Sequence, residues 1–130
     1  MTPHLWRVRV YYEDVDLAGI VYHANHLRYI ERARSEMVRA AGLDQRAMRE
    51  AGLVFVVTRI EADYLRPARY DDLLDIETTL ESIGKARFTL GQVVLRDAVP
   101  LFRARVTVAC MDLAGRPRRL PPGVAALADA

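Results

Sequence analysis

Cysteine, lysine and long apolar runs are scarce in this chain of 130 residues. The single cysteine, Cys110, has no partner for a disulfide within the chain and falls in an apolar strand pattern, where a buried thiol is expected. No apolar run approaches the ~20 residues of a membrane-spanning helix, and the first residues lack the apolar stretch of a secretion signal. These absences predict a cytoplasmic protein without a membrane span.

Positive charge is carried almost entirely by arginine, because Lys85 is the only lysine among the 19 basic residues. Arginine suits bidentate contact with phosphate or carboxylate, although arginine preference also follows genome composition. A formal net charge of +2 is too small and too dispersed for general nucleic-acid binding. Zinc-ligand spacings are absent as well, so the sequence predicts neither a metal nor a nucleic-acid partner.

The length suits a single domain, residues 1–130, and an apolar fraction of 52% predicts a folded core rather than disorder. Apolar residues at helical spacing predict a long helix from residue 24 or 25 to residue 41, stopped by Gly42. A short helix is expected at residues 44–50. Alternation of apolar and polar residues predicts five strands, at residues 5–12, 53–66, 73–82, 86–96 and 101–111.

The order of these elements predicts an α+β fold in which one helix packs on a curled antiparallel sheet. The last four strands are expected to follow one another as a meander, and the segment from Asp112 onward is expected to be a tail with at most a short helix. The outer strands of such a sheet need protection from uncontrolled pairing. Dimerisation by edge pairing would protect them, so a homo-oligomer is expected.

Residues 11–26 hold three carboxylates, two histidines, one asparagine and three tyrosines between the first strand and the long helix. Titratable groups packed between two core elements are costly unless they serve a function. A carboxylate beside a helix N-terminus can act as a catalytic base or nucleophile. The free N–H groups of the helix can bind the negative oxygen that develops in acyl transfer. This segment therefore favours an enzyme.

The run YEDVDLAGIVYHAN at residues 12–25, followed by LRYIERAR at residues 27–34, resembles the signature of the hotdog-fold acyl-CoA thioesterases. It is most similar to the 4-hydroxybenzoyl-CoA thioesterase family and, within that family, to the acyl-CoA thioesterases associated with the Tol-Pal system. The resemblance implies the hotdog fold, a long central helix wrapped by a five-stranded antiparallel sheet. It also implies an acyl-CoA substrate, hydrolysis without metal or cofactor, and a homodimer or homotetramer with active sites at the dimer interface. A cell-envelope or lipid-synthesis protein is a candidate partner.

The resemblance assigns the family's essential carboxylate, as nucleophile or general base, to Asp16. It assigns the oxyanion donor to the backbone N–H of His23, at the start of the long helix. The alternative for Asp16 is a loop carboxylate that caps a turn. The His23 side chain either orients substrate or moves a proton, or it is structural.

The neighbouring residues are expected to support this pair. Asn25 is expected to cap the helix, with a contact to Asp16 or to substrate as the alternative. Tyr12 lines the pocket or fills space, and Asp14 holds the turn. His26 and Tyr29 are expected to be packing residues on the first turns of the helix.

An apolar channel for the acyl group is expected beside the long helix, lined by Ile20, Val21, Val57 or Phe55. Coenzyme A carries three phosphate groups, so basic residues should surround its site. The candidates are strand and turn residues after the helix, namely Arg59, Arg66, Arg69, Lys85 and Arg87, with ordinary surface ion pairs as the alternative for each.

Two other functions stay open on the same fold, because a fold alone does not fix an activity. One is a binding module that holds acyl thioesters without hydrolysing them. The other is a protein-interaction module that uses the surface of the sheet. The acyl group itself is expected to be short-chain or aromatic.

Overall fold

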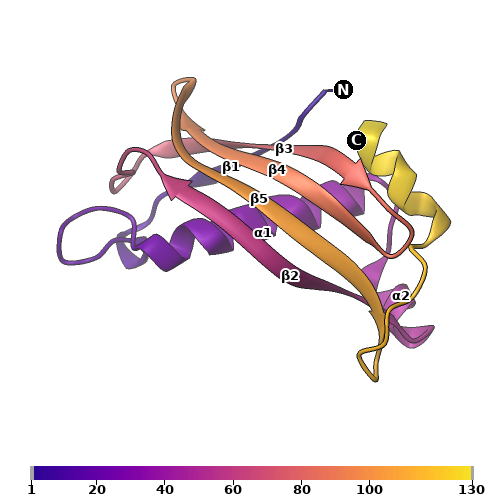
Figure 1. Cartoon of the computed structure of the whole chain (residues 1–130). Coiled ribbons are helices and arrows are strands. Elements are labelled where there is room, and N and C mark those ends of the chain that lie inside the picture. The colour runs from indigo at the N-terminus through magenta and orange to yellow at the C-terminus, as the bar shows by residue number, and fades with distance from the viewer. Residues whose placement is uncertain (1, 130) are drawn as a thin grey trace.

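The computed structural model describes residues 2–129 and consists of one antiparallel sheet curved over one long helix (Figure 1). The predicted α+β architecture is confirmed. The sheet has five strands, β1 His4–Arg9, β2 Leu53–Tyr64, β3 Leu73–Ile83, β4 Arg87–Arg96 and β5 Val99–Asp112. The helical elements are α1 His23–Ala40, α2 Gln45–Glu50, and two 3-10 segments, η1 Tyr12–Asp14 and η2 Pro122–Asp129.

Helix α1 lies along the concave face of the sheet. Ile30, Ala33 and Met37 recur at helical spacing and are buried, so they form the stripe that packs on the sheet. The helix ends at Ala40, and Gly42 follows with a φ of +84°, a left-handed conformation that glycine adopts without a steric penalty. The helix predicted from the periodicity is confirmed to within two residues at each end. Among the described residues, no helix has the length and apolar character that a membrane crossing needs.

The strand order is β1-β3-β4-β5-β2, which differs from the predicted meander. Only β3, β4 and β5 follow one another, whereas β2 crosses the molecule and pairs with β5 instead of β3. Strands β1 and β2 are therefore the two edges of the sheet. Sequence periodicity identifies each strand but carries no information about which strand lies beside it.

Strand β2 contains an irregularity at Thr58, where the register with β5 shifts between Val57 and Arg59. An extra residue in a strand reverses the alternation of side chains beyond it. Phe55 therefore packs edge-on against the core residue Phe88 before the bulge, while Tyr64 reaches the same concave side after it. The sequence predicted one unbroken alternation from residue 53 to residue 66, and this prediction was wrong.

Both ends of the chain depart from the expected pattern. The first strand ends at Arg9, and Tyr12 belongs to η1 rather than to the strand. At the other end, η2 is more than a loose tail, because Val124 and Leu127 are buried in the hydrophobic core. Cys110 is buried on β5, as predicted.

Candidate active site

A cavity of 380 Å³ lies at the N-terminal end of α1, where the loop before the helix meets the end of β2. Its walls come from two segments of the chain that are far apart in sequence, residues 16–26 and 64–67. The lining residues are Asp16, Ile20, Val21, His23, His26, Tyr64, Leu65, Arg66 and Pro67. We call this hollow the Asp16 cavity. It brings together five of the residues singled out by sequence as site residues, Asp16, Ile20, Val21, His23 and Arg66.

Asp16 is held in a tight turn by its own backbone and side chain. Its N–H donates to the carbonyl of Ile20 (2.9 Å), and its carbonyl accepts from Gly19 N–H (2.9 Å). Its Oδ1 accepts from the N–H of Ala18 (2.9 Å). Gly19 has a φ of +80°, which this turn requires. Asp16 therefore does cap a turn, but with one carboxylate oxygen only, and no described residue hydrogen-bonds to its Oδ2.

The start of α1 presents free backbone donors. Tyr22 is the N-cap residue and makes no side-chain cap hydrogen bond. The N–H of Asn25 donates back to the carbonyl of Tyr22 (2.8 Å), whereas the N–H groups of His23 and Ala24 donate to no acceptor among the described residues. Unpaired N–H groups at a helix N-terminus carry partial positive charge and bind anions.

Asn25 does not cap the helix, so this expectation was wrong. Its Nδ2 donates to the carbonyl of Asp14 (2.9 Å), and its Oδ1 accepts from Arg28 (3.0 Å). Asn25 is buried and ties the first turn of α1 to η1. Asp14 does hold the turn, because its Oδ2 accepts from the N–H of Tyr11 (2.8 Å). Neither residue lines the Asp16 cavity.

Tyr64 anchors the first turn of α1 from the end of β2. Its hydroxyl donates to the carbonyl of His23 (2.8 Å), and burial raises the pKa of this hydroxyl. Its ring also packs edge-on against Phe102. The sequence marked Tyr64 only as a strand residue, because a bond across 41 positions of the chain leaves no local signal.

His26 is both a packing residue, as predicted, and part of the cavity wall. Its side chain is 3% exposed and stacks on Phe102 with a centroid distance of 4.9 Å. Its Nδ1 is buried without a hydrogen-bond partner among the described residues. Burial lowers the pKa of His26 to about 4, so the imidazole is neutral at pH 7.

The remaining predicted site residues lie elsewhere. Tyr12 is 83% exposed and lines a separate shallow hollow with Tyr70. Arg59, in the middle of β2, forms an ion pair with Glu61 (3.5 Å). Lys85 and Arg87 belong to the turn and strand at the opposite end of the sheet, where Figure 1 shows α2 and the β3–β4 turn.

The predicted acyl channel is divided between two places. Ile20 and Val21 lie in the Asp16 cavity, whereas Phe55 and Val57 line a second cavity of 170 Å³ between the sheet and the C-terminal half of α1. We call this the inner cavity. The two cavities share no lining residue.

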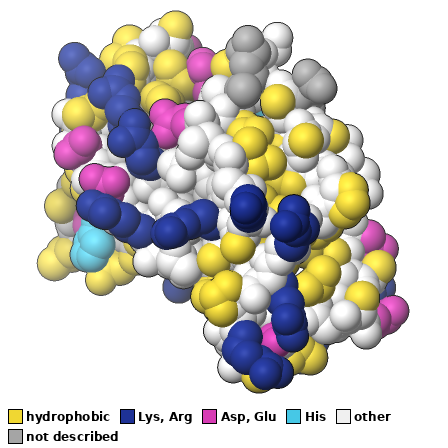
Figure 2. Space-filling view, turned by 45° about the vertical axis from the view of Figure 1, so that its right-hand side comes forward, with side chains coloured by type: hydrophobic (Ala, Val, Ile, Leu, Met, Phe, Trp, Pro, Cys, Tyr) yellow, Lys and Arg dark blue, Asp and Glu magenta, His cyan; other side chains and the backbone are white. Residues whose placement is uncertain are grey.

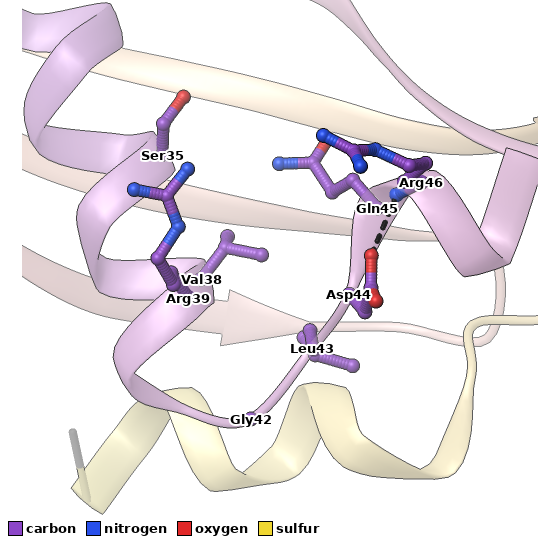
Figure 3. A pocket seen from close by; sticks show the side chains of 8 residues that line it. All are labelled: Ser35, Val38, Arg39, Gly42, Leu43, Asp44, Gln45 and Arg46. Atoms are coloured by element: carbon purple, nitrogen blue, oxygen red, sulfur yellow. Dashed lines mark hydrogen bonds between the residues drawn. The ribbon is translucent and has the colours of Figure 1, made fainter.

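A larger hollow, 600 Å³, lies beside the inner cavity at the corner between α1 and α2. It shares three residues with that cavity, Ser35, Val38 and Gln45. Figure 3 shows Ser35 and Arg39 of α1 facing Gln45 and Arg46 of α2 across this hollow. Asp44 caps α2 with hydrogen bonds from Arg46 N–H (2.9 Å) and Ala47 N–H (3.1 Å).

A long helix on the concave face of a five-stranded antiparallel sheet is the architecture of the hotdog fold. A model of the thioesterase-like superfamily matches residues 10–127. The chain belongs to the thioesterase-like superfamily.

Two acyl-CoA thioesterases with similar sequences support this membership. The acyl-CoA thioester hydrolase YbgC of Escherichia coli is 41% identical over 123 residues, which cover 93% of this chain and 92% of that protein. The acyl-CoA thioesterase YbgC of Haemophilus influenzae is 43% identical over 107 residues, which cover 82% of this chain and 79% of that protein.

Solved structures share the fold over nearly the whole chain. A probable thioesterase from Bartonella henselae superposes with a TM-score of 0.87 at 39% identity and covers 92% of this chain and 99% of its own. A mutant of 4-hydroxybenzoyl-CoA thioesterase, complexed with 4-hydroxybenzoyl-CoA, superposes with a TM-score of 0.90 at 23% identity, covering 98% of this chain and 99% of its own. The second likeness shows the fold alone.

Proposed function

We propose that this chain hydrolyses short-chain or aromatic acyl-CoA thioesters to the free acid and coenzyme A. Asp16 is the attacking group or its general base, and the N–H groups at the start of α1 are the oxyanion site. The observation that carries this proposal is one cavity that contains both the Asp16 carboxylate and His23, the first residue of α1. The named acyl-CoA thioesterases at 41–43% identity support the same activity.

Thioester hydrolysis needs an attacking oxygen and a stabiliser for the negative charge on the carbonyl oxygen. As a general base, Asp16 takes a proton from water while the water oxygen bonds to the acyl carbon. As a nucleophile, Asp16 bonds to that carbon itself, and water then cleaves the mixed anhydride. In both routes the carbon–sulfur bond breaks, and the coenzyme A thiolate leaves and takes up a proton. The free N–H groups of His23 and Ala24 stabilise the oxyanion.

Coenzyme A phosphates require basic groups, and Lys85 and Arg87 lie too far from Asp16 within one chain to serve its own site. Register places Arg87 opposite Ala109 of β5, at the level where β2 begins, whereas Tyr64 of β2 pairs with Phe102 beside the Asp16 cavity. Figure 2 turns this far end of the molecule forward and shows a band of Lys and Arg side chains across it. Arg66 of the same chain already lines the Asp16 cavity, and we infer that a partner subunit presents Lys85 and Arg87 beside it.

We propose that this partner is a second copy paired through β2. The strand is an edge of the sheet, and Val56, Val57 and Ile60 remain 37%, 40% and 39% exposed on it. Antiparallel pairing of β2 with its copy about a twofold axis brings the beginning of one strand beside the end of the other. Lys85 and Arg87 of one subunit then approach the Asp16 cavity of its partner.

The activity is tested by measuring free thiol released from butyryl-CoA and benzoyl-CoA by the purified protein. Asp16→Asn should lower kcat by about 100-fold or more, because general-base or nucleophilic catalysis is lost. The matched control is Glu13→Gln, which makes the same chemical change three residues away on an exposed side chain and should leave kcat unchanged.

Circular dichroism should show the same fold for both variants. Undiminished activity of Asp16→Asn would overturn the mechanism. Binding of acyl-CoA by the wild-type protein without hydrolysis would favour the binding module instead. A single turnover in ¹⁸O-labelled water separates the two roles of Asp16, because label in its carboxylate identifies a nucleophile.

A further inference from the structure

Arg34 is a half-buried arginine on α1 that forms no ion pair within the described part of the chain. Its guanidinium lines the inner cavity, and its Nη1 donates to Oε1 of Gln92 (3.1 Å). Burial lowers the pKa of Arg34, an effect that the charge of Glu31 partly offsets. An arginine nonetheless stays protonated in proteins. The positive charge of Arg34 is therefore permanent and poorly compensated.

A buried network fixes the position of this charge. Gln92 is 0% exposed on β4, and its Nε2 donates to the carbonyl of Ile30 (2.9 Å) and to Oγ1 of Thr78 (3.0 Å). These two bonds orient the amide of Gln92 so that its oxygen faces Arg34. Since a guanidinium has five N–H donors and this contact uses one, donors remain for a ligand.

The cavity below Arg34 is apolar. Its walls include Phe55, Phe88, Leu90 and Val108 from three strands of the sheet. Its volume of 170 Å³ accommodates about six non-hydrogen atoms at the ~30 Å³ that a water molecule occupies in the liquid. An apolar ligand that filled this space would remove water from Arg34 and leave its charge unpaired, which is costly.

Glu31 is the one carboxylate on the rim, and it does not remove this cost. Its Oε1 accepts from the hydroxyl of Ser35 (3.1 Å), and it forms no ion pair with Arg34. Two further arginines, Arg39 and Arg46, line the adjoining hollow (Figure 3). Arg39 is paired with Glu36 (2.7 Å), whereas Arg46 has no ion pair among the described residues.

We propose that the inner cavity holds the acyl group of the substrate and that Arg34 recognises a carboxylate at its far end. The preferred substrates are then thioesters of short dicarboxylic acids. An ionised carboxylate accepts two N–H bonds from a guanidinium and neutralises it, so the same desolvation that penalises an apolar acyl group favours a carboxylate.

This inference rests on the proposed function and on pairing through β2. Arg34 follows His23 by eleven positions, about 16 Å along α1, which is beyond the reach of an acyl chain of about six atoms starting at the same subunit's Asp16. Phe55 and Val57, however, lie on the first half of β2. Twofold pairing places this half beside the Tyr64 end of the partner's strand, and so beside the partner's Asp16 cavity.

The test compares kcat/KM for glutaryl-CoA with that for 5-methylhexanoyl-CoA, whose branched end has the shape of the carboxylate without its charge. Wild-type protein should prefer glutaryl-CoA, and Arg34→Met should lower the ratio of the two values by about tenfold or more. Arg32→Met is the control, because Arg32 lies over the ring of Tyr29 instead of lining the cavity. It should leave the ratio unchanged.

Thermal unfolding checks that the variants fold, and Arg34→Lys, which keeps the charge, should keep part of the preference if Arg34→Met does not fold. A wild-type ratio at or below one, with both thioesters hydrolysed, would overturn this inference and leave the proposed function standing. Hydrolysis of neither thioester would count against the proposed function. Calorimetric binding of both thioesters to Asp16→Asn then decides whether the carboxylate is preferred.

Discussion

At the scale of single residues, the candidate site combines one carboxylate with an imidazole in a very different environment. Asp16 is half-buried and keeps one oxygen without a partner among the described residues, whereas His26 is enclosed by three aromatic rings, those of Tyr29, Tyr64 and Phe102. Because burial lowers its pKa, the imidazole of His26 is uncharged at pH 7 and forms a neutral part of the wall of the Asp16 cavity. It also makes folding sensitive to acid.

The free energy of unfolding should therefore fall as the pH falls from 6.5 to 4. The unfolded chain takes up a proton on His26 near 6.5, whereas the folded chain takes it up only near 4, so acid favours the unfolded state in this window. A difference of about 2.5 pH units corresponds to about 3 kcal/mol. Urea unfolding at several pH values measures the slope.

His26→Phe is the variant that isolates this contribution, because phenylalanine keeps the stacking on Phe102 and does not titrate. The variant should lose about that amount of pH dependence relative to wild type, while the contribution of the carboxylates stays the same in both proteins. Identical pH profiles for the two proteins would show that His26 is not buried in solution as it is here.

At the scale of elements, the N-terminus of α1 is held from outside the helix. Tyr64 of β2 bonds to the carbonyl of His23, and Asn25 bonds to the carbonyl of Asp14. Because the helix has no side-chain cap of its own, these contacts fix the direction of its free N–H groups. The precision of the proposed oxyanion site thus depends on a strand at the edge of the sheet.

Tyr64→Phe should lower kcat by about fivefold to tenfold with little change in KM, since catalysis is more sensitive than binding to small shifts of positioned groups. Steady-state kinetics with butyryl-CoA measures the effect. Stability should change by about 1 kcal/mol or less, because the lost hydrogen bond is partly exposed to water. A proportional rise in KM with unchanged kcat would indicate that Tyr64 contacts substrate rather than orienting the helix.

The sequence predicted α1 and its preceding turn well because both depend on local signals, namely apolar spacing, Gly19 and Gly42. It also marked Asp16, Ile20, Val21 and His23, which the fold does bring to one cavity. It did not predict the anchoring role of Tyr64 or the buried link between Gln92 and Arg34, which depend on pairing across 41 and 58 positions. No residue type or spacing near either position distinguishes these contacts in advance.

At the scale of the whole molecule, the groups assigned to the proposed site lie far apart within one chain. The Asp16 cavity lies at one end of the sheet, and Lys85 and Arg87 lie at the other. The inner cavity is displaced from Asp16 as well. Pairing through β2 would bring both the basic residues and the inner cavity of one subunit toward the partner's Asp16 cavity, which is why we propose this edge and not β1 as the interface.

Ile60→Lys on β2 should therefore reduce the solution mass from a multiple of the 14.7 kDa chain to the monomer and abolish most hydrolysis. The matched control is Leu5→Lys on β1, the opposite edge, where the side chain is already 64% exposed. Sedimentation equilibrium gives the mass, and its wild-type value separates dimer from tetramer. Dissociation by Leu5→Lys alone would place the interface on β1.

The bulge at Thr58 determines which side chains of β2 face the concave side of the sheet. Phe55 and Val57, at odd positions before the bulge, line the inner cavity. Tyr64, at an even position after the bulge, hydrogen-bonds to the first residue of α1, so the bulge places all three side chains on the same side of the sheet. If the full sequence of β2 alternated strictly, without a bulge, Tyr64 would point outward, and Glu61 and Asp63 would face the core in its place. Substitutions along β2 can adjust either cavity separately, but an insertion or deletion of one residue between the bulge and Tyr64 would turn Tyr64 away from the start of α1.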